Sequence, residues 1–431
     1  MARGVRHFVA AAALLAAVAY TALYGHLDSL PQIRSDGYSY YVYLPSVFIY
    51  HDATLETLAN DWYGGTYPDF TGIRRWPSTH RWLNLHPIGT SVLMAPFFLV
   101  ADLLSVWSNL PRDGFSLYYQ HGAALAAIAY FLLGLALLRR MLRRQFSDGV
   151  VLATLICITW GTNLFHYAVF DGTFSHAYAF FLVCLWVWLV EQWWDRPTMA
   201  GSLAVGGVAA LNVLVRHTNA IFVLLLPLYG IVHWRDVRAR ALELRDRWRL
   251  LAAAASAGVL VLAPQLALYK WITGEWFVNA YVTHGMGFTL GSPHLIAVLF
   301  STQKGLFFWS PVLLLCVAGV FLATGRARAL ALPAVVLFAL QTWLIASWSQ
   351  WQFGASFGHR GYTDGFALAA PFIAACFAWA ARRRRTASLF AAGATAAVLL
   401  SIAQMIQYWI GVLPMSDTTW AQYQDLFLRF R

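Results

Sequence analysis

The sequence predicts an all-α fold, a polytopic helical membrane protein of about eleven transmembrane helices. Of its 431 residues, 60% are hydrophobic and only 11% are charged, whereas soluble domains usually carry about 25% charged residues. Long apolar segments recur from end to end, each near the ~20 residues that a helix needs to cross a hydrocarbon core. A membrane β-barrel would show shorter segments of alternating hydrophobicity. We therefore expect a single integral membrane domain over residues 1–431, without a separate soluble domain.

Most of the arginines gather in short gaps between apolar runs. Four clusters stand out: Arg139, Arg140, Arg143 and Arg144; Arg235, Arg238, Arg240, Arg245, Arg247 and Arg249; Arg326 and Arg328; and Arg382 to Arg385. Positively charged loops of membrane proteins stay on the cytoplasmic side. The net charge of +11 therefore reports topology, and it indicates no nucleic-acid partner.

The first apolar run extends from Phe8 to Tyr24 and follows Arg3 and Arg6. It has no clear small-residue cleavage site before Asp28, so we expect a retained helix with a cytoplasmic N-terminus that leaves the membrane near His26. The four cysteines lie inside apolar runs at unrelated spacings, which predicts neither a disulfide framework nor a zinc motif.

Residues 88–108 are apolar enough to span the membrane, but spanning would place every later arginine cluster outside. We therefore expect this segment to lie in the outer interface, broken by Pro87 and Pro96, within a first extracytoplasmic loop over residues 27–117. The remaining spans are expected at about 118–138, 149–169, 174–194, 200–217, 219–234, 250–270, 305–323, 330–347, 361–381 and 387–410.

This expected topology places nearly all the distinctive polar residues outside the cytoplasm, in segments 27–117, 170–174, 271–304 and 348–360. Asp36 lies in the first of them, in QIRSDGYSYYVYLPS (residues 32–46). It is either a solvated loop acid or a general base at the membrane surface. For the second interpretation, neighbouring aromatic rings would raise its pKa towards a working range. These rings are Tyr38, Tyr40, Tyr41 and Tyr43.

The second outer loop contains Asp171, in HYAVFDGTFSHAYAFF, with His176 at the start of the next helix. A carboxylate in so short a turn at the membrane is costly unless it is paired or used. Asp171 is thus a candidate for catalysis, and helix capping by Asp171 or Ser175 is the alternative.

Three cations are expected at the same outer level. Arg216 lies in the turn RHTN with His217, Thr218 and Asn219, which offers several hydrogen-bond donors to a phosphate. Lys304 and Arg360 begin later spans. Snorkelling to the interface is the alternative for Arg216. An anionic substrate would explain why positive charge accumulates outside.

Other outer residues suit sugar or metal binding less specifically. Trp348 and Trp351 either stack on sugar rings or anchor the chain at the interface. His80 and His86 offer metal ligands beside Asp36, but no metal-binding motif is present. No metal and no cofactor is therefore expected, although a divalent metal is possible at those three side chains.

Taken together, these motifs resemble the GT-C superfamily of membrane glycosyltransferases. The superfamily includes bacterial lipid A aminoarabinose transferases and protein O-mannosyltransferases, which use polyprenyl-phosphate sugars. The likeness runs through SDGYSYYVYLPS, HPIGTSVLMAPFFL, GTNLFHYAVFDGTFSHAYAFFL, VLVRHTNAIF and WQFGASFGHRGY. The chain departs from many members because Gly37 replaces the second acid of a pair in the first loop, and because it has no large soluble domain.

The resemblance implies an inverting glycosyltransferase, a hexosyl or pentosyl transferase, of the bacterial inner membrane with an extracytoplasmic site, in glycolipid or polysaccharide biosynthesis of the cell envelope. Asp36 would be the catalytic base, assisted by Asp171, and Arg216, Lys304 and Arg360 would bind the donor phosphate. We expect the two carboxylates and the cations to converge in one cavity on the non-cytoplasmic side, and a large separation of Asp36 from Asp171 would count against the enzyme. Further substrate-binding candidates are Tyr40, His86, His176, Asn219 and Trp351. The expected partners are a polyprenyl-phosphate sugar, membrane lipid, and an acceptor glycan, lipid or protein. The alternative is a transporter of lipid-linked sugars or lipids that forms no bond, and a third interpretation is a scaffold protein of the envelope.

Overall fold

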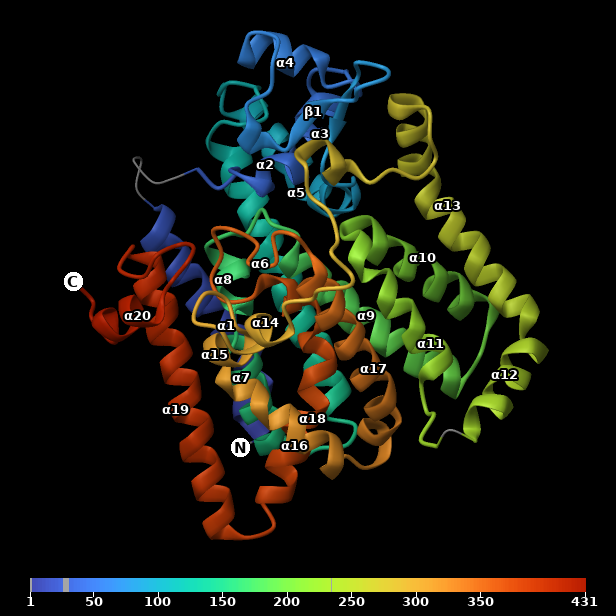
Figure 1. Ribbon diagram of the computed structural model, residues 1–431, viewed down its shortest axis with the longest axis vertical. Helices are drawn as coiled ribbons and strands as arrows, with labels where there is room; N and C mark the ends of the chain where they lie inside the picture. The colour runs from blue at the N-terminus through green and yellow to red at the C-terminus, as the bar shows by residue number, and fades with distance from the viewer. Residues whose placement is uncertain (1, 26–30, 234) are drawn as a thin grey trace.

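The computed structural model describes residues 2–25, 31–233 and 235–431 and is almost entirely helical (Figure 1). Its only paired strands are β1 (Ile73–Arg75) and β2 (Trp82–Asn84) within that part of the chain, which form a short antiparallel hairpin. The expected exit of the first helix near His26 lies outside the described residues. The all-α class predicted from the apolar runs is confirmed.

Eight described helices are long and apolar enough to cross a membrane, which makes this a multi-pass membrane protein. They are α1 (Ala2–Tyr24), α5 (Gly89–Trp107), α6 (Leu117–Leu142), α9 (His176–Asp195), α13 (Trp248–Thr273), α17 (Gly325–Ser347), α18 (Phe366–Ala380) with the turn before it, and α19 (Arg384–Trp409). Four apolar helical segments are shorter, at residues 148–160, 199–215, 217–228 and 311–322. The count of eleven spans stays a prediction.

Three expected spans are interrupted, and for these the prediction of one continuous helix is wrong. Residues 149–169 divide into α7 (Asp148–Trp160) and α8 (Leu164–Val169). The helical part of the expected span 219–234 ends at Leu228 and consists of the 3₁₀ helix η2 (His217–Leu224) and α11 (Leu225–Leu228). Residues 305–323 divide into α15 (Leu306–Trp309), η4 (Pro311–Leu313) and α16 (Leu314–Leu322). Pro311 cannot donate a backbone hydrogen bond, which explains the last break.

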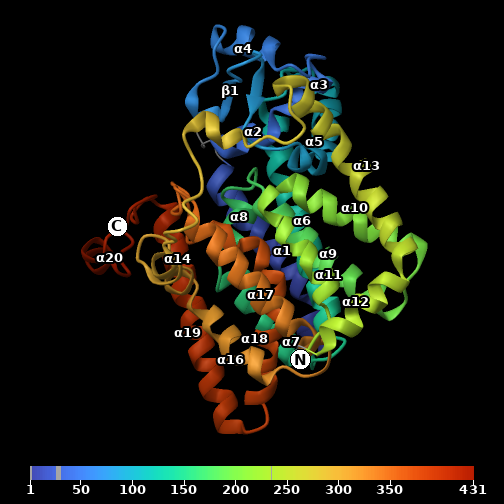
Figure 2. The same cartoon turned by 45° about the vertical axis from the view of Figure 1, so that its right-hand side comes forward.

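The core of the bundle consists of α6, α7, α9 and α18, which pack against one another. α1 covers α6 and α7, and α19 lies against α7 and α18. A second group projects to one side of this core, where α10 (Met199–Val215) packs along α13 and joins α9 (Figures 1 and 2). Gly206 permits this close crossing, because a Cβ atom there would lie 2.5 Å from the carbonyl carbon of Ala254.

A cap of short elements covers one end of the bundle (Figures 1 and 2). In chain order it contains α2 (Asp36–Tyr41), α3 (Tyr43–Phe48), α4 (Glu56–Tyr63), the 3₁₀ turn η1 (Asp69–Thr71), the β1–β2 hairpin and α5. α5 continues through Pro96, so the predicted break at this proline is wrong. Gly89 at its start lies against Leu214, and Asp102 near its end accepts a hydrogen bond from Tyr119. α5 also packs along α6, where Phe97 contacts Tyr130, and it is long enough to span, so its expected position in the outer interface stays a prediction.

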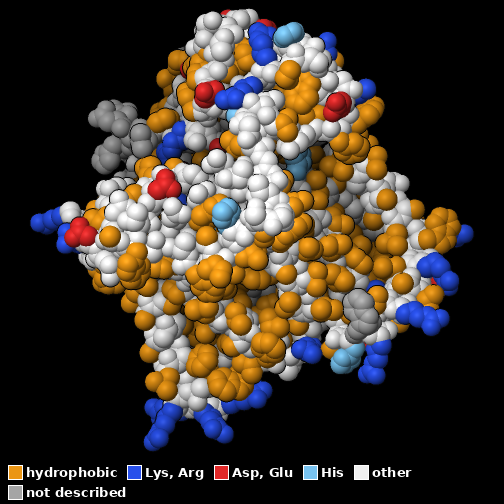
Figure 3. All heavy atoms as spheres, in the orientation of Figure 1, with side chains coloured by type: hydrophobic (Ala, Val, Ile, Leu, Met, Phe, Trp, Pro, Cys, Tyr) orange, Lys and Arg blue, Asp and Glu red, His pale blue; other side chains and the backbone are white. Residues whose placement is uncertain are grey.

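Three arginine clusters meet at the end of the bundle away from the cap. Glu191 lies 3.1 Å from Arg144 and 3.7 Å from Arg326, and Arg240 of α12 (Asp236–Asp246) lies 3.6 Å above the Trp194 ring. Figure 3 shows hydrophobic side chains over the middle of one face and Lys or Arg side chains below them, at the α18–α19 turn and over α12. This gathering of positive charge is what the orientation rule requires, and which side faces the cytoplasm stays a prediction.

Candidate functional site

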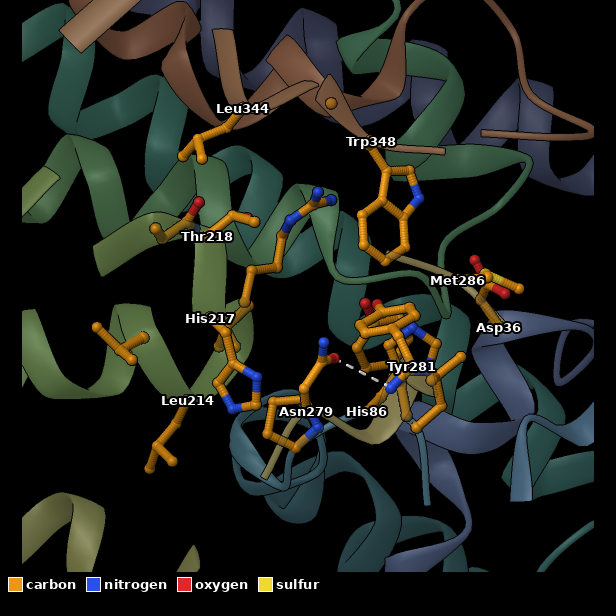
Figure 4. A pocket seen from close by; sticks show the side chains of 18 of the residues that line it. Asp36, His86, Leu214, His217, Thr218, Asn279, Tyr281, Met286, Leu344 and Trp348 are labelled. Atoms are coloured by element: carbon orange, nitrogen blue, oxygen red, sulfur yellow. Dashed lines mark hydrogen bonds between the residues drawn. The ribbon is translucent and has the colours of Figure 1, made fainter. Parts of the chain in front are cut away.

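A cavity of about 640 Å³ lies between the cap and the bundle. Its walls come from α2, the turn after β2, the end of α10 with η2, α13, the end of α17, and two loops at residues 276–288 and 348–361. Figure 4 shows side chains from these elements pointing into it, including Asp36, Asn279 and Trp348. Seven of the predicted site residues line it: Asp36, Tyr40, His86, His176, Arg216, Asn219 and Arg360.

Asp36 occupies the first turn of α2 and forms an ion pair with Arg360, the first residue of the 3₁₀ helix η5 (Arg360–Gly365). The distance between Oδ2 and Nη1 is 2.9 Å, and the Asp36 side chain is 32% exposed. Burial raises the pKa of Asp36, but Arg360 and the more distant His86 and His176 outweigh burial and leave that pKa below its usual range. The expectation that aromatic neighbours raise this pKa is therefore wrong, because a guanidinium lies against the carboxylate.

Close packing explains why residue 37, next to Asp36, carries no side chain. A Cβ atom at this position would lie 2.0 Å from the hydroxyl of Thr173 in the turn between α8 and α9. That hydroxyl donates to the carbonyl of Gln32 at 2.8 Å, so the first two outer loops are in direct contact. A longer side chain at residue 37 would separate them.

Arg216 follows the last turn of α10 and meets two side chains from other helices. Its Nη1 donates to Nδ1 of His176 at 3.0 Å, and its Nε lies 3.2 Å from Oδ2 of Asp364 in η5. Asp364 is 1% exposed. This acid was missed by the sequence analysis, although a carboxylate at the start of an expected span (residues 361–381) was the available signal. The ion pair with the buried Asp364 holds Arg216 at the cavity wall.

His86 and Tyr40 form the wall of the cavity next to Asp36. Their rings are 4.0 Å apart, and Nδ1 of His86 lies 2.5 Å from Oγ of Ser39, which itself donates to the carbonyl of Asp36. Burial lowers the pKa of His86 to about 4 despite the opposing charge of Asp36. His86 is therefore neutral at neutral pH, with Nδ1 as the donor to Ser39.

The possible metal site at Asp36, His80 and His86 does not form. His80 lies in the turn between β1 and β2, whereas His86 follows β2 and lines the cavity. Among residues 2–25, 31–233 and 235–431, no group of three or more His, Cys, Asp or Glu side chains is arranged to hold a metal ion.

Asp171 does not line the cavity, which contradicts the expectation that it meets Asp36 there. Its carboxylate lies 2.9 Å from Arg34 and 3.0 Å from Nε2 of His166, while Trp409 donates to Nδ1 of the same ring at 2.9 Å. Burial raises the pKa of Asp171, but His166 and Arg34 outweigh burial and lower it overall. Asp171 thus joins the first loop, α8 and α19 in a buried polar cluster.

Lys304 and Trp351 also lie outside the cavity lining, contrary to expectation. The Lys304 ammonium donates to the carbonyls of Ser356 and Met415, and burial lowers its pKa to about 7. It therefore ties the loop before Arg360 to the segment after α19. Trp351 is buried with its ring 5.7 Å from that of His294, and Trp348 supplies the indole in the cavity wall.

The fold and the site define a multi-pass helical membrane protein with a charged, partly apolar cavity at one end of its bundle. No family model, no curated protein and no solved structure matches the chain.

Proposed function

We propose that this protein is an inverting glycosyltransferase that moves a sugar from a polyprenyl phosphate to an acceptor of the cell envelope. The observation that carries the proposal is the composition of one cavity. An ionised carboxylate, Asp36, two guanidinium groups, Arg216 and Arg360, and a largely apolar wall all line it. These are the groups needed to activate an acceptor, bind a phosphate and accommodate a lipid.

In this proposal the lipid enters beside α13. The lining residues of this helix include Leu262 and Leu266, and the loop that follows contributes Phe277, which is 81% exposed. An exposed aromatic side chain next to an apolar cavity wall suits contact with the acyl region of a membrane. The phosphate would then reach Arg216 and Arg360 while the isoprenoid chain stays among apolar side chains.

The reaction exchanges one bond to the anomeric carbon for another. The donor phosphate binds Arg360 and draws it from Asp36, whose carboxylate is then free to take the proton from an acceptor hydroxyl or amine. The acceptor atom attacks the anomeric carbon from the side opposite the phosphate, and the bond between that carbon and the phosphate oxygen breaks. Polyprenyl phosphate leaves with the electron pair, and the two arginines stabilise its additional charge. The donor is already activated, so the reaction needs no nucleotide.

The proposed site faces the extracytoplasmic side of a bacterial inner membrane, with eleven spans and a cytoplasmic N-terminus. The separation of the cavity from the arginine clusters supports this orientation, because the clusters gather at the opposite end of the bundle. The resemblance to polyprenyl-phosphate-sugar-dependent transferases supports it as well.

Single-turnover transfer from a radiolabelled polyprenyl-phosphate sugar, with purified protein in proteoliposomes, tests the proposal. We expect label to appear in a new glycosidic bond to an envelope extract and free polyprenyl phosphate to accumulate in equal amount. Movement of intact donor between leaflets without a new bond would instead identify a transporter. No turnover and no movement would leave neither function tenable.

Arg216→Gln is expected to weaken binding of the donor about ten- to a hundredfold, because a charge-assisted contact to phosphate is lost. Asp364, which is 1% exposed, loses its ion-pair partner in this variant, so thermal unfolding is measured first and donor affinity is compared per folded molecule. Arg75→Gln is the matched control, since Arg75 lies on the cap, pairs with the partly exposed Glu56 and does not line the cavity. Equal donor affinity of both variants, measured by equilibrium binding in nanodiscs, would remove Arg216 from the phosphate site.

The rate of transfer is expected to remain level from neutral pH through the mildly acidic range and to decline only below the pH at which an ordinary aspartate takes up its proton, about 4. Asp36 acts as a base only when it is ionised, and its pKa lies below the usual range. The loss of rate is therefore displaced towards lower pH. Protonation of His86, with its pKa of about 4, would add to the same decline. A profile of kcat/KM against pH checks this, and a decline centred near pH 6 would contradict it.

A further inference from the structure

Two polar groups on the α13 wall of the cavity have no hydrogen-bond partner. Gln265 and Tyr269 lie four residues apart on α13, hence on one face of that helix, and both line the cavity. They are only 2% and 4% exposed. The Nε2 atom of Gln265 and the hydroxyl of Tyr269 make no hydrogen bond in the structure.

The orientation of the Gln265 amide is fixed by the cap. Its Oε1 accepts a hydrogen bond from the backbone N–H of Ile88 at 2.9 Å. Both hydrogens of Nε2 consequently remain available as donors, and the Tyr269 hydroxyl adds a group that donates or accepts. Unpaired donors in an apolar wall are costly, and a polar ligand bound in the cavity would supply the missing partners.

The charges of the cavity narrow the class of that ligand. Asp36 is the one carboxylate among its lining residues, all of which the structure describes, and it is paired with Arg360. The other lining polar side chains near α13 are uncharged amides, hydroxyls and histidine rings, whereas Arg216 and Arg360 are cations. A ligand that brings a further positive charge would find no free acid.

We propose that Gln265 and Tyr269 form the subsite for the sugar of the donor, and that this sugar is uncharged, a neutral hexose or pentose and not a cationic amino sugar. The inference rests on the proposed function. Gln265 donates a hydrogen bond to one sugar hydroxyl, and Tyr269 donates to or accepts from another. The phosphate of the same lipid lies at Arg216 and Arg360.

Two variants test the subsite with little change of shape. Tyr269→Phe removes only the hydroxyl, and Gln265→Glu keeps the oxygen that accepts from Ile88 but replaces the donating amide by a carboxylate. Ser256→Ala is the matched control, because Ser256 is an exposed polar residue of the same helix outside the cavity lining. Thermal unfolding of each variant verifies that the fold is retained.

Binding is measured in nanodiscs with three lipids: polyprenyl phosphate, polyprenyl-phosphate hexose and its amino-deoxy analogue. We expect each variant to bind the hexose lipid about five- to tenfold more weakly, the loss of one hydrogen bond, with unchanged affinity for the sugar-free lipid. The wild type should prefer the neutral hexose, and Gln265→Glu should shift preference towards the amino-deoxy analogue.

Equal losses for the sugar-free and hexose lipids, or no loss for either, would overturn the subsite and leave the proposed function intact. Tighter binding of the amino-deoxy analogue by the wild type would overturn the neutral class. Displacement of the hexose lipid by an equal concentration of phosphatidylglycerol would show that the subsite takes a polyhydroxyl headgroup instead of a sugar. If the wild type binds none of the polyprenyl lipids, the proposed function itself fails.

Discussion

Asp36→Asn is expected to lower the single-turnover rate of sugar transfer about a hundred- to ten-thousandfold, the range associated with losing a general base. The substituted amide has nearly the same shape, but it cannot take the proton of the acceptor. Arg360 loses its carboxylate partner at 2.9 Å in this variant and stays free for the donor phosphate. Donor affinity should therefore be retained or increase while the chemical step is lost.

Asp69→Asn is the control for this experiment. Asp69 is an acid of the same cap and pairs with Arg74, but its side chain is 87% exposed and it does not line the cavity. Its substitution should leave the rate unchanged. An Asp36→Asn protein with the wild-type rate would remove Asp36 as the base, and a protein that no longer binds donor would assign Asp36 to binding.

Asp171→Ala is expected to act on stability and not on chemistry. The change leaves Arg34 and the buried His166 without their shared carboxylate, and breaking a buried pair from one side costs about 3–5 kcal/mol of the free energy of unfolding. Denaturant or thermal unfolding should show this loss. The rate per folded molecule should remain near that of the wild type, because Asp171 does not line the cavity.

Asp171→Asn separates the two roles further. Its side-chain oxygen still accepts from Arg34 or His166, so we expect a smaller loss of stability than in Asp171→Ala. A stable Asp171→Ala protein without transfer would contradict the structural role and restore Asp171 to the reaction.

The sequence was sufficient to predict the class of fold. The apolar runs predict the long helices α6, α9, α13 and α19, and the arginine clusters predict which helix ends lie together. The interruptions between α7 and α8 and between α15 and α16 were not predicted. Pro311 was a local signal of the second interruption, because a proline cannot donate a backbone hydrogen bond. The run 149–169 contains no proline, and its composition is as apolar as that of one continuous helix.

The candidate site was predicted in part. Asp36, Arg216 and Arg360 were found because each is a charge at a helix end within apolar surroundings. The same criterion selected Asp171 and Lys304, whose partners are Arg34, His166 and the carbonyls of Ser356 and Met415. Only three-dimensional contacts distinguish a charge that faces a cavity from one that joins two loops.

The Gln265 amide and the Tyr269 hydroxyl could not be identified as site groups from the sequence either. Gln265 and Tyr269 lie in an apolar helix and carry no charge, so nothing in their local pattern separates them from ordinary residues of a span. Their significance comes from burial, from the contact of Gln265 with Ile88 and from the absence of a partner for two of their atoms.

The central claim is that one cavity holds the donor phosphate next to Asp36. A structure of the Asp36→Asn protein in nanodiscs with bound polyprenyl-phosphate sugar tests it most directly. The account predicts a phosphate within hydrogen-bonding distance of Arg216 and Arg360, and an anomeric carbon that faces residue 36. A donor whose phosphate lies instead at the arginine clusters of the opposite end, or outside the cavity, would contradict it.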